Sequence, residues 1–249
     1  MRSPFKLLDA YEYEDRDVFF GREEETAELY QMVFKTPLLL IYGSSGTGKS
    51  SLVQCGLANR FDGTDWFPFF IRRQDDINQA LRNALQHALP PKETPKNNLN
   101  DAVSFLFQYY LRPIYLIFDQ LEELFILGNK EEQENFGKAI QDLIASEFPC
   151  KIIFLMREEF IGQLFLIEKY LPTIYDFRMR VEPMGFKKIQ EVVLKSCEHY
   201  SIQFEDAEKD IQQIYENLSG GKSGIQLPYL QVYLDMLYRE DFQRSYPEA

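Results

Sequence analysis

The chain has 249 residues, of which 45% are hydrophobic and 27% charged, and its formal net charge is −12. This length fits one large domain or two small ones of a water-soluble globular protein, and the negative charge disfavours general binding to nucleic acid or to an anionic membrane. No apolar run approaches the roughly 20 residues that span a bilayer. The N-terminus lacks the apolar core of a signal peptide, and the three scattered cysteines are typical of reduced thiols, so we expect a cytoplasmic protein.

The chain begins with a segment rich in aromatic and acidic residues, which leads into Phe19-Phe20-Gly21-Arg22. A helix is predicted from about 23 to 34, and Thr36-Pro37 would end it. The two phenylalanines have two interpretations of equal weight. They either pack in the core or form a wall beside a nucleotide base.

The most informative stretch comes next, where an apolar run at 38–42 leads into the pattern G-x-x-x-x-G-K-S at 43–50. This is the P-loop spacing. Its glycines can adopt φ > 0, so that successive N–H groups point into one concavity at a helix N-terminus, which favours phosphate over the alternative of an empty turn. Lys49 is expected to reach the outer phosphates and the Ser50 hydroxyl to bind Mg²⁺. The predicted nucleotide-binding residues of this loop are Gly43, Ser44, Ser45, Gly46, Thr47, Gly48, Lys49, Ser50 and Ser51.

Strands and helices alternate after the P-loop. We expect a helix to about 60, a strand at 67–72, a helix at 76–88, a linker at 89–98 and a helix at 100–111. An apolar strand at 114–118 then ends on Asp119, which would hold Mg²⁺ directly or through water. Glu122 or Glu123 could polarise the attacking water, although these acids could also simply begin a solvated helix.

The alternation ends with two more strands. A helix is expected at 131–146 and a strand at 150–156, which leads to Arg157. A cation at that strand end can face the γ-phosphate, or it can pair with a carboxylate such as Glu158. A short strand is expected at 176–181, and only helices follow, at about 186–200, 206–217 and 227–238. The Gly-Lys-Ser at 221–223 is not a second P-loop, because no strand precedes it.

Five strands that alternate with helices, with a phosphate loop after the first strand, indicate a doubly wound α/β sheet. We expect two domains in the chain. Residues 1–183 would form a P-loop ATPase core with an N-terminal segment on the base side, and residues 184–249 a small helical domain.

Several stretches together resemble the STAND class of signal-transducing P-loop ATPases, and most of all its novel STAND NTPase branch, which is related to AAA+ ATPases. They are F-F-G-R-E at 19–23, the P-loop, D-Q-L-E-E at 119–123, M-R at 156–157 and L-P-Y-L-Q at 227–231. The resemblance covers essentially the whole chain. It implies a P-loop fold with a five-stranded parallel sheet of order 5-1-4-3-2, flanked by helices and followed by a small helical domain. The winged-helix and sensor regions that usually follow in this class have no counterpart among these residues.

The resemblance also implies roles for single residues. Phe20, Gly21 and Arg22 would lie beside the base, Asp119 would bind Mg²⁺, Glu122 would activate water, Arg157 would act as a sensor, and Pro228 would contact the base from the helical domain. One departure is Gln226, which stands where many members carry glycine.

The ligands implied are ATP or ADP with Mg²⁺. The function implied is a slowly hydrolysing switch, whose nucleotide state controls domain closure and oligomerisation, through self-association or partner signalling domains. Two alternatives stay open. One is an AAA+-like ATPase acting on nucleic acid, which the acidic charge of this fragment disfavours. The other is a nucleotide-binding scaffold without hydrolysis, since Gln120 replaces the acid that follows the metal aspartate in many P-loop ATPases.

Overall fold

The computed structural model describes residues 5–91, 93–94, 96, 98–146, 148–221 and 224–245, with the backbone alone for 241–245. Three residues of the predicted linker, Lys92, Pro95 and Asn97, lie outside the described residues, as do Lys222 and Ser223 of the Gly-Lys-Ser segment and the first four residues of the chain. In the part of the chain described, no helix has the length and apolar character needed to cross a membrane.

By its internal contacts the chain divides into two compact units. The first unit comprises Met1–Thr26, Ser44–Asn59 and Val181–Ala249, and the second comprises Ala27–Gly43 and Arg60–Arg180. The P-loop thus groups with the N-terminal segment and the C-terminal helices, whereas the sheet belongs to the second unit. The division into domains at 183/184 stays a prediction.

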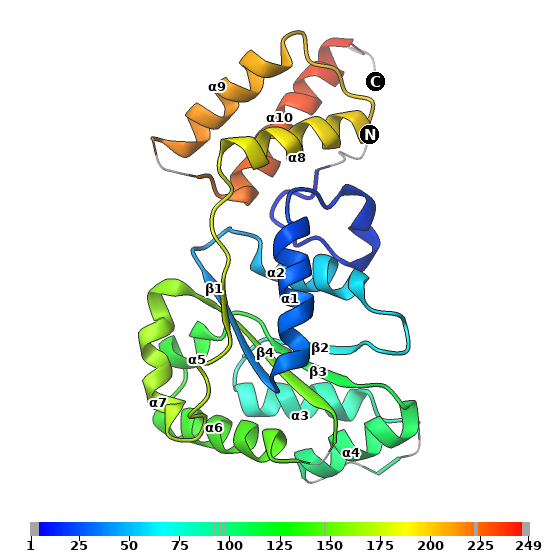
Figure 1. Ribbon diagram of the computed structural model, residues 1–249, viewed down its shortest axis with the longest axis vertical. Coiled ribbons are helices and arrows are strands. Elements are labelled where there is room, and N and C mark those ends of the chain that lie inside the picture. The colour runs from blue at the N-terminus through cyan, green and yellow to red at the C-terminus, as the bar shows by residue number, and fades with distance from the viewer. Residues whose placement is uncertain are drawn as a thin grey trace. The chain divides into compact units, whose positions relative to one another are not determined.

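The second unit is built on a five-stranded sheet (Figure 1). Its strands are β1 (Leu38–Gly43), β2 (Phe67–Ile71), β3 (Ile114–Phe118), β4 (Cys150–Arg157) and β5 (Arg178–Arg180). They lie in the order β2-β3-β4-β1-β5, and every neighbouring pair is parallel. This is the predicted order 5-1-4-3-2 read from the opposite edge, so the predicted fold is confirmed.

The sheet forms because its strands are apolar runs that can be buried on both faces. All five residues of β3 are buried, and the rings of Phe118, Phe136 and Phe154 meet at centroid distances of 5.1, 5.6 and 5.8 Å. The helices and helical turns of this unit are α3 (Ile77–His87), α4 (Leu99–Tyr110), α5 (Glu122–Ile126), α6 (Lys130–Ile144), a 3₁₀ segment (Glu158–Leu164) and α7 (Phe165–Glu168). Helix α1 (Glu23–Lys35) begins in the first unit and continues into the second.

The register of the sheet aligns its carboxyl ends. Gly43, the last residue of β1, lies opposite Arg157 of β4, and Phe118, the last of β3, lies opposite Phe154. Because parallel strands end at the same edge, the residues that follow β2 and β3 and those that end β1 and β4 share one edge of the sheet. Gly43 is also the first residue of the P-loop, which therefore starts at this edge.

The first unit contains the predicted C-terminal helices, α8 (Phe186–His199), α9 (Ala207–Ser219) and α10 (Leu227–Ser245), together with a 3₁₀ turn at Tyr13–Val18. Their apolar faces form a second core, which includes Ile189, Val193, Ile211 and Leu230. Asp206 caps α9 by accepting a hydrogen bond from the Lys209 amide, and Gly220 ends it in the left-handed conformation.

The helix predicted after the P-loop is only partly regular. It consists of α2 (Lys49–Ser51), a π-helical segment (Leu52–Leu57) and a 3₁₀ turn (Ala58–Arg60). Gly56 of this segment packs closely, because a Cβ placed there would lie 2.6 Å from Thr26 Oγ1. Single-turn π-helical segments within α-helices are rare and have no counterpart in apolar periodicity.

Candidate nucleotide-binding site

The P-loop has the backbone that a phosphate-binding nest requires at two of its three glycines. Gly46 and Gly48 have φ of 73° and 86°. Gly43 does not share this conformation, because it is still part of the extended strand β1. The loop is closed on itself by the Ser44 carbonyl, which accepts hydrogen bonds from Lys49 Nζ at 2.9 Å and Thr47 Oγ1 at 3.0 Å.

The other serines of the P-loop differ in their surroundings. Ser45 is exposed and Ser50 half-buried. The Ser51 hydroxyl accepts a hydrogen bond of 3.1 Å from the Tyr11 amide, and so ties the helical turn after the loop to the N-terminal segment.

Arg22 joins three segments of the first unit. Its guanidinium is buried and donates through Nη2 to the Thr47 carbonyl at 2.9 Å and the Glu182 carbonyl at 2.8 Å, and through Nη1 to Glu25 Oε1 at 2.6 Å. One side chain therefore connects the P-loop with the start of α1 and with the segment before α8 through hydrogen bonds. A role beside the base stays a prediction for Arg22.

The carboxylate of Glu25 balances this arginine. Burial alone would raise the pKa of Glu25, but hydrogen bonds from Lys188, the backbone and Arg22 outweigh it, so the pKa lies below its usual value. Lys188 Nζ lies 2.7 Å from Glu25 Oε1, which links α8 to the start of α1.

Phe20 and Gly21 pack against α8. Gly21 has a φ of 79°, and a Cβ on it would lie 2.7 Å from Val192 Cγ2, so both backbone conformation and space require glycine. Phe20 packs on the second core, which α8, α9 and α10 form, and Lys195 Nζ lies 5.7 Å from the centroid of its ring. The packing interpretation of Phe20 is thus confirmed, and contact with a base stays a prediction.

The first turn of α10 lies directly on the P-loop. The Leu227 amide donates to the Gly46 carbonyl at 2.9 Å. A Cβ on Gly46 would lie 3.1 Å from both Gln226 Cβ and Pro228 Cδ, and one on Gly48 would lie 3.1 Å from Leu227 Cδ1. Sequence reasoning assigned Pro228 to a base and missed this contact with the loop itself.

In the second unit, Asp119 lies at the carboxyl edge with an arginine from the neighbouring strand. Its Oδ2 accepts hydrogen bonds from Arg72 Nη2 at 2.7 Å and Arg72 Nε at 3.1 Å. Arg72 directly follows β2, the neighbour of β3 in the sheet. Sequence reasoning did not predict a role for Arg72. Its position directly after the strand adjacent to β3 could have indicated that it lies near Asp119.

Glu122 and Arg157, predicted as water activator and sensor, are brought together. Glu122 is buried; its Oε1 lies 3.2 Å from Arg157 Nε, and its Oε2 accepts from the Arg157 amide at 3.2 Å. The other partner considered for Arg157, Glu158, pairs with Arg180 at 2.9 Å. Glu123 is half-buried beside this pair in the chain.

The described residues contain no group of three or more histidine, cysteine, aspartate or glutamate side chains that could hold a metal ion. A hydroxyl such as that of Ser50 and a carboxylate such as that of Asp119 are oxygen ligands of the kind that Mg²⁺ takes in phosphate sites, where phosphate oxygens and water supply most of the other ligands. The binding of Mg²⁺ by these two residues stays a prediction.

Several solved structures have a similar fold. A Walker-type ATPase of Pyrococcus abyssi is 20% identical, with a TM-score of 0.67 over 94% of this chain and 71% of that one. The ORC2 protein of Aeropyrum pernix in its ADP form is 12% identical, with a TM-score of 0.66 over 90% of this chain and 64% of that one. Drosophila ORC bound to DNA is 17% identical, with a TM-score of 0.55 over 90% and 62%. At these identities the likeness shows the fold alone.

Comparison at the level of sequence identifies the family. No protein with a curated function matches the chain. A family model, Novel STAND NTPase 1, matches residues 4–247, nearly the full length, and agrees with the motifs and the sheet order. The chain belongs to the novel STAND NTPase 1 family.

Proposed function

We propose that this protein is an ATP-binding switch of the STAND class, which hydrolyses ATP slowly and whose nucleotide state controls domain closure and self-association. The observation that carries the proposal is the P-loop of Gly46, Gly48 and Lys49, which follows β1 of a parallel sheet whose strand β3 is followed by Asp119 and Glu122. Amide groups, an ammonium, a hydroxyl and a carboxylate are the groups that a Mg²⁺–triphosphate requires.

Each side chain has a distinct role in this proposal. Lys49, which donates to Ser44 in the structure described, turns to the outer phosphates when the nucleotide is bound. Ser50 and Asp119 hold Mg²⁺, which when bound neutralises charge on the phosphates. Glu122 orients and polarises the attacking water.

The pairing of Glu122 with Arg157 supports slow turnover. A carboxylate whose two oxygens are engaged by a guanidinium and by an amide cannot orient a water molecule until that contact is released. The same observation favours a second candidate, a nucleotide-binding scaffold in which Glu122 stays engaged and hydrolysis does not occur. The likeness to an ORC bound to DNA extends to fold alone, and the charge of −12 does not favour a nucleic-acid substrate.

The proposal is tested by a titration of a fluorescent ATP analogue with Mg²⁺ into the Lys49→Ala variant. A lost hydrogen bond to a charged group is worth ~1.5–3 kcal/mol, so we expect the affinity to fall about ten- to hundredfold. Lys35→Ala, which removes an exposed lysine of α1, is the matched control and should bind like the unaltered protein. Equal affinity of the Lys49→Ala variant and the control would contradict the assignment of the site.

A further inference from the structure

Two consecutive arginines follow β2 and have opposite surroundings. Successive side chains of an extended segment point to opposite sides, and here Arg72 reaches Asp119 whereas Arg73 reaches Glu132. The side chain of Arg73 is 10% exposed and that of Glu132 4%, so this pair is enclosed. The side chain of Arg72 is 56% exposed, although its partner Asp119 is only 5% exposed.

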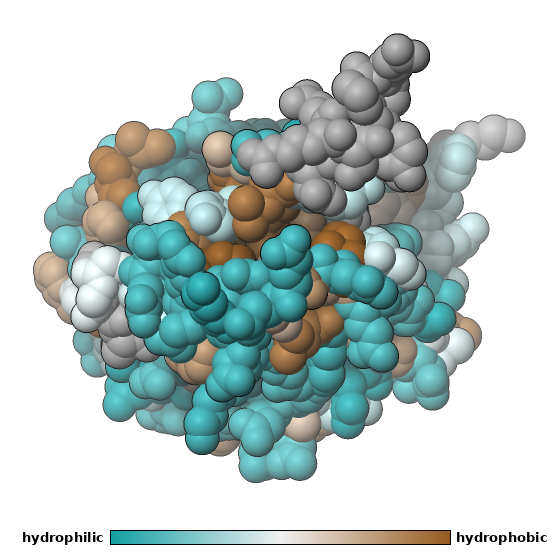
Figure 2. Space-filling model, turned by 90° about the horizontal axis from the view of Figure 1, so that it is seen from above, coloured by the Kyte–Doolittle hydropathy of each residue, from teal (hydrophilic) through white to brown (hydrophobic). Residues whose placement is uncertain are grey.

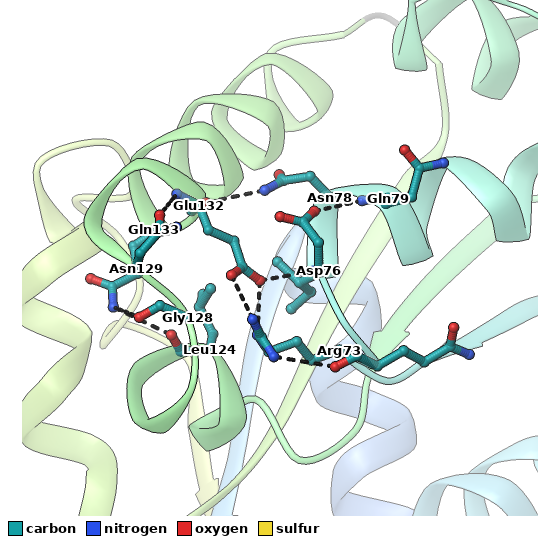
Figure 3. Close-up of polar contacts among 11 residues, drawn as sticks. Arg73, Asp76, Asn78, Gln79, Leu124, Gly128, Asn129, Glu132 and Gln133 are labelled. Carbon is teal, nitrogen blue, oxygen red and sulfur yellow. Dashed lines mark hydrogen bonds and ion pairs between the residues drawn. The ribbon is translucent and has the colours of Figure 1, made fainter.

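The Arg73–Glu132 pair fixes the position of the segment after β2 (Figure 3). Glu132 Oε1 accepts from Arg73 Nε and from the Ile77 amide, both at 2.9 Å, and Oε2 accepts from Arg73 Nη2 at 2.8 Å. The hydrogen bond to Glu132 raises the pKa of Arg73. The Asn129 side chain accepts from the Glu132 amide at 2.9 Å, so the first turns of α3 and α6 are tied to the same arginine.

The backbone at Arg72 is therefore held in place by the neighbouring pair. The Arg72 side chain reaches Asp119 from this backbone and is itself half-exposed to solvent. It binds through Nε and Nη2 to the single oxygen Oδ2, and does not span both carboxylate oxygens. Such a half-exposed contact is weak and screened by solvent, in contrast to the enclosed pair next to it.

We propose that Arg72 is a positioning residue that neutralises Asp119 in the absence of metal and gives up this place when Mg²⁺–nucleotide enters. The inference rests on the proposed function, because it takes Asp119 as the metal carboxylate. A buried carboxylate needs a nearby cation in either state. Because two cations repel each other, Arg72 and Mg²⁺ would compete for the Asp119 carboxylate, and Arg72 would set the Mg²⁺ concentration at which the site fills.

The experiment measures binding and does not depend on turnover. A fluorescent ADP analogue is held at fixed concentration with the 249-residue chain, and Mg²⁺ is titrated. The Arg72→Gln variant removes the competing charge, so its half-saturating Mg²⁺ concentration should fall about two- to fivefold, the equivalent of one exposed ion pair. Arg82→Gln removes one exposed positive charge from α3 and is the matched control.

The outcomes separate the two proposals. If Arg72 only supports folding, the Arg72→Gln variant melts at a lower temperature but keeps the Mg²⁺ dependence of the unaltered protein, which overturns the inference and leaves the proposed function intact. If the unaltered protein binds no nucleotide, both fall. Should Arg72→Gln fail to fold, Arg72→Lys replaces it: we expect a smaller shift to lower Mg²⁺, because the planar fork is lost. No shift, or a shift to higher Mg²⁺, overturns the inference.

Discussion

Single residues of the acidic motif D-Q-L-E-E differ in role because they differ in environment. Asp119 accepts from Arg72, and Glu122 is buried against Arg157, whereas Glu123 is only half-buried. Gln120 adopts a φ of 61°, an uncommon conformation for a residue with a side chain, and it turns the chain sharply after β3. The letters of the motif could not distinguish Glu122 from Glu123, because the choice depends on this turn.

We expect the Glu122→Gln variant to bind nucleotide but to release phosphate about 10²- to 10⁴-fold more slowly, the usual contribution of a positioned general base. Glu123→Gln should keep most of the activity and is the matched control. Steady-state phosphate release, with binding measured in parallel, checks this. If Glu123→Gln is the slower variant, the assignment is reversed, and if the unaltered protein releases no phosphate, the scaffold alternative is favoured.

At the level of elements, apolar periodicity predicted most of the longer helices to within a few residues, because their buried faces set the pattern. The last helix, α10, was predicted to end at about 238 but continues to Ser245, and the short helix α7 was not predicted. Apolar periodicity also did not predict the π-helical segment Leu52–Leu57 or the 3₁₀ segment Glu158–Leu164. These segments differ from an α-helix only in which amide bonds to which carbonyl, and the spacing of apolar residues does not record that difference.

The contact between the P-loop and the first turn of α10 can be tested through Gly46. An alanine in the left-handed conformation costs about 1–2 kcal/mol, and at Gly46 its Cβ would also press on Gln226 and Pro228. Gly220→Ala is the matched control, since Gly220 has a φ of 55° but open space around it. Urea unfolding should show a larger loss for Gly46→Ala than for Gly220→Ala, and equal losses would show that the contact with α10 contributes nothing.

For the molecule as a whole, alternating patterns indicated a parallel sheet, and the family resemblance supplied the order of its strands. Neither could supply the pairing of Asp119 with Arg72 or of Arg22 with the Thr47 carbonyl, because such contacts depend on which side chains the register brings together. The face seen in Figure 2 is mostly hydrophilic, with hydrophobic residues in separate groups, as expected from the charged composition.

The three cysteines provide a probe of both units in the intact protein. All are buried, and burial raises the pKa of Cys55 and of Cys150 to about 12 and also raises the pKa of Cys197. Labelling with a thiol reagent near neutral pH should therefore be slow and limited by local opening. Cys55 lies in the helical segment after the P-loop and Cys150 begins β4, so added Mg²⁺–nucleotide should slow the labelling of Cys55 more than that of Cys150.

Mass spectrometry of the labelled peptides gives the rate at each cysteine separately. Cys150 acts as the control within the same molecule. Equal protection of both cysteines by nucleotide would mean that the ligand stabilises β4 as much as the helical segment after the P-loop. That result would contradict the prediction.

The hydrogen bond from the Leu227 amide to the Gly46 carbonyl joins main chain to main chain. Nearly any amino acid at position 227 can donate this hydrogen bond, because the donor belongs to the main chain and not to the leucine side chain. A search for co-varying positions in related genes would not detect this hydrogen bond, since no pair of side chains needs to change together to keep it. Proline is the one common replacement that would sever it, because proline has no amide hydrogen to give.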